Sequence, residues 1–169
     1  FIHDDAVVYG LRQVKGASKR ELEKLFELMV DGYDHIDYLH LVFPNVNKRT
    51  VEALIDVGGF DYLGKSRSEL KHLYSCLSAL TDKEREWIIK SGIRDIKKAL
   101  LKCSVPKKEG GGASTKRRTP KILDILDRIE NPGRDLRDNP STIAQREESL
   151  MGVALSVSYM DALSLIHIS

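Results

Sequence analysis

Apolar residues that recur at helical spacing, between residues that start and stop helices, are the feature that most constrains this fold. The clearest case is SKRELEKLFELMV, residues 18–30, where apolar residues lie at i, i+3, i+4 and i+7: Leu22, Leu25, Phe26 and Met29. This spacing is that of one buried helical face. Ser18 with Glu21 has the pattern of a capping box, and Gly32 is a stop signal. The segment therefore predicts an amphipathic helix.

The same combination of helical apolar spacing with helix start and stop residues repeats along most of the chain. Further helices are expected over residues 7–14, 36–43, 47–57, 66–77, 81–103, 119–130 and 141–151. Their expected N-caps are Asn47, Ser66, Thr81 with Glu84, Thr119 with Pro120 at the first helical position, and Ser141. In the long helix over 81–103, Trp87, Ile88, Ile96, Leu100 and Leu101 are expected to face inward. Gly92 weakens the middle of that helix and is where it would break. The only strand-like segment is the weak VALSV at 153–157, so the sequence predicts an all-α fold.

Composition and charge divide the chain into parts. Residues 104–119 combine glycines, proline, small polar residues and basic charge, and predict a flexible basic linker. From Lys102 to Lys121 there are seven basic residues and one acid, whereas the rest of the chain holds 20 basic and 24 acidic residues. The expected division is a tandem module over 1–80, a long helix of an insertion over 81–103, the linker over 104–119, and a helical connection toward a following domain over 120–162. Residues 163–169, LSLIHIS, resemble a translated sequencing adapter; a genuine apolar tail is the alternative.

Several classes of protein are disfavoured by the composition. No apolar run approaches the ~18 residues of a membrane span, and the acidic N-terminus has no signal-peptide pattern. Cys76 and Cys103 match no disulfide framework or zinc spacing, so a cytoplasmic location is expected. The chain lacks an initiator Met, and we expect it to begin within a longer protein.

Two expected helix starts are basic. The turn Lys15-Gly16-Ala17-Ser18 is followed by Lys19, and Asn47-Lys48-Arg49 opens another helix. The first turn of a helix has free N–H groups and a partial positive charge, which together favour phosphate. Such contacts hold a nucleic-acid backbone without reading its sequence. The alternative stays open that Gly16 is only a turn residue and that the lysines are merely solvated.

Three segments resemble one known family. YGLRQVKGASKRELEKL (9–25) and VNKRTVEALIDVGGFDYLGKSRSEL (46–70) resemble the tandem helix-hairpin-helix region of bacterial DNA polymerase III alpha subunits, the C family. REESLMGVALSVSYMDAL (146–163) is similar to the segment after that region, whereas residues 81–140 match poorly and look like an insertion. The resemblance implies contact with duplex DNA phosphates by Lys15, Gly16, Ala17, Ser18, Lys19, Asn47, Lys48 and Arg49. Ser18 replaces the second turn glycine of the family, and if that position needs a positive φ, it is strained by about 1 kcal/mol.

No catalytic machinery is recognisable. Polymerisation needs carboxylates that hold two metal ions, and no Asp-x-Asp on a strand is found. His72 and Cys76 share a helix face, but two ligands make no zinc site. The tyrosines and Trp87 are spaced as core or half-buried anchors rather than as a stacking platform. We therefore expect no catalytic residue, no metal and no cofactor in this segment, although the parent enzyme implied by the resemblance uses Mg²⁺.

The resulting hypothesis is a part of a DNA polymerase III alpha-like protein, from a bacterium or a phage. In this hypothesis the chain binds duplex DNA without reading its sequence, in support of template-directed synthesis. Its expected partners are duplex DNA, the rest of the polymerase chain and a replisome, and no membrane association is expected. The rival hypothesis is a non-catalytic helical interaction module that binds no nucleic acid. Whether the chain is enzymatic is left open by the sequence.

Overall fold

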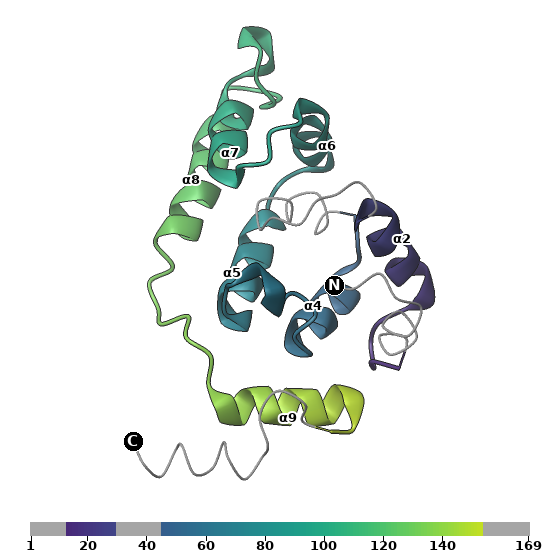
Figure 1. The fold of residues 1–169 in the computed structure, drawn as a ribbon. Helices are drawn as coiled ribbons and strands as arrows, with labels where there is room; N and C mark the ends of the chain where they lie inside the picture. Colours follow the sequence, from purple (N-terminus) through teal and green to yellow (C-terminus); the bar gives the residue numbers. More distant parts are fainter. Residues whose placement is uncertain (1–12, 30–44, 154–169) are drawn as a thin grey trace. The chain divides into compact units, whose positions relative to one another are not determined.

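The computed structural model describes residues 13–29 and 45–153, and all the regular elements in these ranges are helical (Figure 1). The α-helices are α2 (Lys19–Met29), α4 (Lys48–Asp56), α5 (Arg67–Leu77), α6 (Asp82–Ser91), α7 (Ile96–Ser104), α8 (Arg118–Glu130) and α9 (Pro140–Met151). Two short 3-10 helices, η2 (Asp61–Leu63) and η3 (Lys107–Glu109), complete the set. The all-α prediction is confirmed. The helix expected over 36–43, the strand-like stretch after residue 153, the tail at 163–169 and all but residues 13 and 14 of the helix expected over 7–14 lie outside the described residues.

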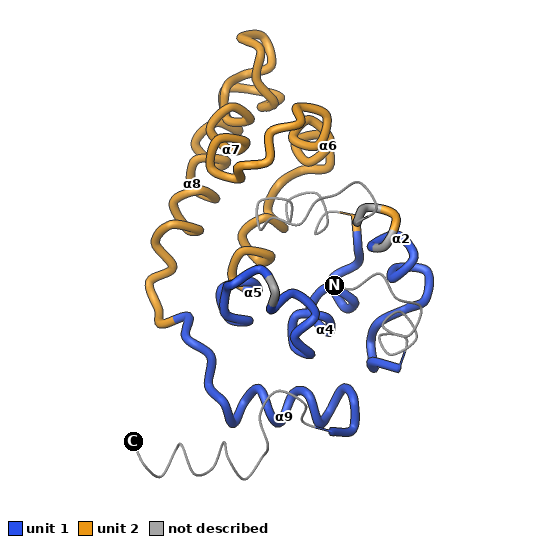
Figure 2. The backbone as a smooth tube through the Cα atoms, viewed as in Figure 1, with its two compact units in different colours: residues 1–26, 46–71, 136–169 blue, residues 27–45, 72–135 orange. Residues whose placement is uncertain are grey.

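The described chain divides into two compact units (Figure 2). Unit 1 comprises residues 1–26, 46–71 and 136–169, and unit 2 comprises residues 27–45 and 72–135. Within the described ranges, no helix is both long and apolar enough to cross a membrane. Unit 1 is therefore assembled from three separate stretches of chain, and α9 belongs to the same unit as α4 although some 80 residues separate them in sequence.

The core of unit 1 is made by the apolar faces that the periodicity identified. Its fully or nearly fully buried side chains are Val14, Leu22, Leu25, Val46, Val51, Leu54, Ile55, Phe60, Leu70 and Ala144. Burying one such leucine or isoleucine contributes about 1.5–3 kcal/mol. Val46 and Val51 occupy the two positions of a hydrophobic staple around the cap of α4, before the N-cap and in the second turn. The staple fixes the direction in which the chain enters α4.

The predicted N-caps of α4, α5 and α6 are confirmed. The Asn47 side chain accepts a hydrogen bond from the Thr50 N–H at 2.9 Å, and Ser66 Oγ accepts one from the Glu69 N–H at 3.0 Å. Thr81 and Glu84 form a complete capping box at the start of α6. These short polar side chains each satisfy an N–H group that the first helical turn leaves free.

Unit 2 contains the break expected at Gly92. This glycine ends α6 with φ +68°, and Asp95 then caps α7 by accepting from the Lys98 N–H at 3.1 Å. The segment 81–103 is therefore two helices rather than one. In its core lie Ile88, Ala99, Leu100, Cys103, Ile122, Ile125 and Leu126, and α7 packs on both α6 and α8. Leu101, expected to face inward, is 43% exposed, so that assignment was wrong.

Two predicted caps are wrong. Thr119 does not cap α8, because its hydroxyl donates to the Ser104 carbonyl at 2.5 Å and the helix already begins at Arg118. Ser141 does not cap α9 either. Asn139 does so, its side-chain oxygen accepting from the Ser141 N–H at 2.9 Å, and Pro140 takes the first helical position that proline favours.

The glycine-rich segment predicted as a linker makes backbone hydrogen bonds within itself. The Lys107 N–H donates to the Ala113 carbonyl at 2.7 Å, and the Ala113 N–H donates to the Val105 carbonyl at 3.1 Å. A Cβ at Gly111 would lie 1.9 Å from the Val105 carbonyl oxygen. The glycines therefore allow the backbone to pass close to itself. Composition alone does not show where the absence of a side chain is needed for such a close approach.

Candidate nucleic-acid interface

The two basic helix starts predicted from sequence lie together in unit 1. The Ser18 N–H donates to Thr50 Oγ1 at 3.5 Å, and the same hydroxyl donates to the Gly16 carbonyl at 3.3 Å. Thr50 is fully buried in the first turn of α4. A single threonine thus joins the turn before α2 to the start of α4, so the two predicted phosphate sites form one surface.

Gly16 is the position at which this arrangement needs glycine. Its φ is +95°, and a Cβ added there would lie 3.4 Å from Arg49 Nε and 3.5 Å from the Ala53 Cβ. Ser18 does not have a positive φ, and neither does any other non-glycine residue in the described ranges. The strain expected at Ser18 was therefore wrong. Ser18 caps α2, as predicted, its Oγ accepting from the Glu21 N–H at 3.2 Å.

Glu21 takes a different role from the one predicted. Its carboxylate does not complete a capping box, because it accepts from the Asn47 N–H at 2.7 Å and from Lys24 Nζ at 2.9 Å. These contacts, the one with Lys24 above all, hold the pKa of Glu21 below its usual value. The buried carboxylate ties the start of α4 to the first turn of α2. The Asn47 N–H is thereby already engaged in a hydrogen bond within the chain.

Other backbone N–H groups of the predicted site are engaged too. The Lys15 N–H donates to the Leu150 carbonyl at 3.0 Å, and the Ala17 N–H donates to the Val14 carbonyl at 3.2 Å. With Ser18 and Asn47 also engaged, four of the eight predicted residues have no backbone N–H to offer a phosphate. Their part in binding would rest on their side chains and on the turn geometry.

The first turns of α2 and α4 retain open donors. In the described part of the chain, the N–H groups of Lys19, Arg20, Lys48 and Arg49 make no hydrogen bond to another group. These are the first and second helical positions, where the backbone N–H has no partner inside its own helix. The partial positive charge of the helix is concentrated at the same place. All four side chains are exposed and basic.

The start of α5 is different. Asp138 accepts from the Arg67 N–H and from the Ser68 N–H, both at 2.9 Å, and from the Ser68 hydroxyl at 3.1 Å. A carboxylate of the chain itself therefore fills the anion site at this helix start. This contrast identifies α2 and α4, not α5, as the helices whose first turns are available to a phosphate.

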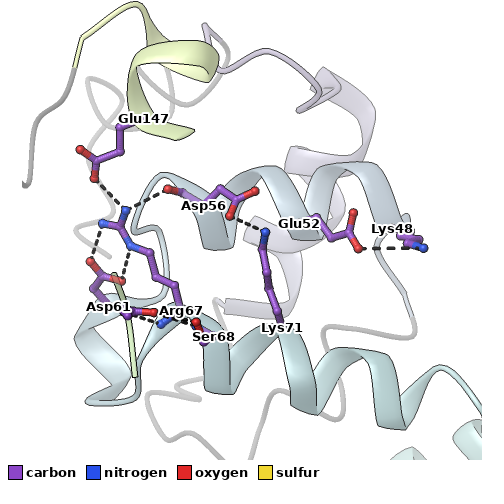
Figure 3. Close-up of polar contacts among 9 residues, drawn as sticks. Lys48, Glu52, Asp56, Asp61, Arg67, Ser68, Lys71 and Glu147 are labelled. Atoms are coloured by element: carbon purple, nitrogen blue, oxygen red, sulfur yellow. Dashed lines mark hydrogen bonds and ion pairs between the residues drawn. The ribbon is translucent and has the colours of Figure 1, made fainter. Parts of the chain in front are cut away.

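A groove of about 430 Å³ runs beside the open start of α4 and the turn that precedes α2. It is lined by Lys15, Gly16, Lys48, Arg49, Glu52, Ala53, Asp56, Arg146, Ser149 and Leu150. Four of these residues are basic and two are acidic. The acids face cations: Asp56 pairs with Lys71 at 2.6 Å, and Glu52 lies 4.0 Å from Lys48 (Figure 3). The groove is therefore cationic in balance, with its acids partly neutralised.

One wall of the groove is α9, and a buried arginine holds that helix in place (Figure 3). Arg67 pairs with Glu147 of α9 at 2.8 Å and donates to the Asp56 carbonyl at 2.9 Å. Its Nε and Nη2 also donate to the two carboxylate oxygens of Asp61, at 3.1 and 2.8 Å. Burial alone would lower the pKa of Arg67, but the contacts with Asp61 and Glu147 outweigh it and raise that pKa. The guanidinium remains charged and links α9 to the end of α4.

Arg146, next to Glu147 in the sequence, is the site residue that sequence reasoning missed. It is exposed, lines the groove and has no ion pair in the described part of the chain. Nothing in its local sequence distinguishes it from other surface arginines. The only available signal was the resemblance of residues 146–163 to a known segment, which places no residue in space.

The residues considered for metal binding do not form a metal site in the described ranges. No group of three or more His, Cys, Asp or Glu side chains there is arranged to hold an ion. His72 Nε2 lies 2.6 Å from the Arg128 carbonyl oxygen and 3.6 Å from Cys76 Sγ. Both side chains are thus placed by contacts within unit 2. Asp34 and Asp37, a carboxylate pair at i, i+3 whose spacing favours solvated side chains over metal ligands, lie outside the described residues.

Comparison with known proteins agrees with this geometry. A helix-hairpin-helix motif family matches residues 1–70. The chain is 35% identical over 85 residues to the DNA polymerase III subunit alpha of Campylobacter jejuni, and 37% identical over 67 residues to that of Pseudomonas aeruginosa. These matches cover 48% and 36% of this chain but only 7% and 6% of the relatives. No solved structure is significantly similar to the chain. Residues 1–70 are therefore similar to a helix-hairpin-helix motif family, and the matched segments are similar to parts of DNA polymerase III alpha subunits.

Proposed function

We propose that unit 1 binds the sugar-phosphate backbone of duplex DNA without reading its sequence. The observation that carries the proposal is the groove lined by Lys15, Lys48, Arg49 and Arg146, which joins the open first turn of α4 to the turn before the open first turn of α2. A phosphate there would accept hydrogen bonds from backbone N–H groups and would be neutralised by the neighbouring cations. Contacts of this kind position a protein on DNA but carry no sequence information.

The eight residues named from sequence would have unequal roles. Lys19, Lys48 and Arg49 offer both an open N–H and a cationic side chain, whereas Lys15 offers only its side chain. Gly16 and Ala17 would keep the turn small enough for a close approach, and Ser18 and Asn47 would hold the two helix starts in place. Arg146 joins this set as a cation supplied by α9.

We further propose that this module serves a DNA polymerase III alpha-like protein. The similarity to two such subunits supports this, although it covers a small part of their length. Template-directed synthesis, Mg²⁺ as the metal of the parent enzyme, replisome partners and a cytoplasmic location belong to the same proposal. No chemical step is assigned to the residues described, because their contribution is to hold DNA.

The test is duplex binding by the full chain at low salt, with two duplexes of unrelated sequence. We expect equal affinity for both, and a clear loss for Lys48→Ala combined with Arg49→Ala. The matched control is Lys65→Ala, because Lys65 is exposed in unit 1 but does not line the groove. A strong preference for one sequence, or an equal loss in the control, would contradict the proposal.

The rival function is a helical interaction module without nucleic-acid binding. The observation that favours it is the presence of Glu52 and Asp56 in the groove, since acids repel phosphate. A chain that is folded by circular dichroism and yet shows no binding to either duplex at low salt would support this rival.

A further inference from the structure

A second groove, in unit 2, combines an aromatic ring with lysines. Its volume is about 480 Å³, and its lining includes Trp87, Lys83, Lys90, Lys107 and Gly112. The residues come from α6 and from the glycine-rich loop after α7. The helix-hairpin-helix match ends at residue 70, so that match assigns no role to this groove.

The charges that line this groove favour an anion. Lys90 pairs with Glu86 at 2.9 Å, and this contact lowers the pKa of Glu86. Glu86 is therefore charged, and Lys90 balances its charge. Lys83 and Lys107 are exposed and have no ion pair in the described part of the chain. The groove therefore keeps two cations that no carboxylate of the described chain neutralises.

The indole ring is held in a fixed place. Trp87 is half-buried, and a Cβ added to Gly112 would lie 2.8 Å from Cδ2 and 2.9 Å from Cγ of its ring. The Gly112 backbone thus rests against the indole, and hydrogen bonds from the Gly112 N–H to the Cys103 carbonyl and from the Gly111 N–H to the Pro106 carbonyl hold the loop, both at 3.2 Å. A nucleotide has a flat base, which stacks on an aromatic ring, and a phosphate, which pairs with cations. The indole ring and the two lysines of this groove offer a partner for each.

We propose that this groove binds single-stranded DNA, with a base stacked on Trp87 and phosphates paired with Lys83 and Lys107. A single strand fits better than a duplex because its bases are exposed for stacking, whereas those of a duplex are already stacked. The inference does not depend on the duplex contact proposed for unit 1, since the two rest on different residues. It goes beyond the expectation that Trp87 is a core or half-buried anchor, since a half-buried ring also keeps an exposed part.

Trp87 is the only tryptophan in the chain, so its fluorescence reports on this groove alone. The experiment titrates the full chain with an oligo(dT) of about ten nucleotides, a length within the range that single-strand sites cover. We expect saturable quenching that weakens with added salt. Thymidine monophosphate should quench only at far higher concentration, because it offers one phosphate instead of several.

The variants separate this site from the duplex site. Lys83→Ala with Lys107→Ala should weaken the binding and reduce the salt slope by roughly 1.4, at about 0.7 for each phosphate of a single strand. Lys98→Ala with Lys102→Ala is the matched control, because both lysines are exposed on α7 but do not line the groove. Lys48→Ala with Arg49→Ala should leave the quenching unchanged. No quenching by the folded chain, equal binding of the monophosphate, or an unchanged affinity and slope in the Lys83/Lys107 variant would overturn the inference.

Discussion

At the scale of single residues, the glycines differ in what they make possible. Gly58 has φ +82°, and a Cβ there would lie 2.4 Å from Arg67 Nη2 and 2.7 Å from Asp61 Oδ2. Gly64 has a similar φ of +77° but no atom within 4 Å of its Cβ position. Both positions therefore carry the backbone cost of adding a side chain, and only Gly58 adds a clash with the ion pair of Arg67 and Asp61.

This difference predicts two unequal losses of stability. Gly64→Ala should lower the free energy of unfolding by about 1–2 kcal/mol, the cost of a left-handed residue with a Cβ. Gly58→Ala should lower it further, because the Arg67–Asp61 pair must move. Urea unfolding of both variants measures the difference. Equal losses would show that the Arg67–Asp61 pair moves without a cost in stability.

Sequence reasoning was most successful at this scale. Asn47, Ser66, Thr81 and Gly92 were assigned correctly because capping and chain breaking depend on a few neighbouring residues. Thr119 was assigned wrongly because its hydroxyl donates to a distant carbonyl, that of Ser104. Ser141 was assigned wrongly because Asn139, two residues earlier, caps α9. Glu21 shows the same limit, since its partner Asn47 is 26 residues away.

At the scale of elements, buried ion pairs join helices that the sequence does not connect. In unit 2, Glu84 at the start of α6 accepts from Arg118 of α8 at 2.6 and 2.8 Å, and Glu84 is 1% exposed. Burial raises the pKa of Glu84, but the hydrogen bonds from Arg118 and Thr81 outweigh it and hold that pKa below 4.5. The pair favours the charged carboxylate in the folded state.

The lowered pKa predicts a pH dependence of stability. Because the folded pKa lies below the unfolded one, the stabilisation is complete above about pH 4.5 and is lost as the pH falls through the folded pKa. Glu84→Gln should therefore cost about 1–3 kcal/mol near neutral pH and much less in acid. Unfolding free energies of both proteins at pH 7 and pH 3 measure this, and a cost that is the same at both values would contradict it.

In unit 1, the corresponding prediction concerns α9. Glu147→Ala removes a buried partner of Arg67 and should lower the free energy of unfolding by about 3 kcal/mol, the lower end for breaking a buried pair, since Asp61 remains. Glu148→Ala is the matched control, because this side chain is exposed, and its cost should stay within about 0.5 kcal/mol. Thermal or urea unfolding compares them. Similar losses in both would mean that the Arg67–Glu147 pair does not hold α9.

At the scale of the whole molecule, the candidate interface depends on contacts that local patterns do not encode. Periodicity identified the helices and the basic starts of α2 and α4, and the resemblance suggested their function. Neither placed α9 beside them, because the Lys15–Leu150 and Arg67–Glu147 contacts join residues far apart in sequence. The close approach of Gly111 and Gly112 to Val105, Cys103 and Trp87 is likewise not encoded in a local pattern.

The central claim, that Lys48, Arg49 and Arg146 neutralise duplex phosphates in one groove, is tested most directly by the salt dependence of binding. The measurement is the slope of log affinity against log salt for the unmodified chain and for the variant with all three changed to Ala. We expect the slope to become shallower by roughly 2.7, at about 0.9 for each duplex phosphate. A folded triple variant that keeps the affinity and the slope of the unmodified chain would contradict the claim.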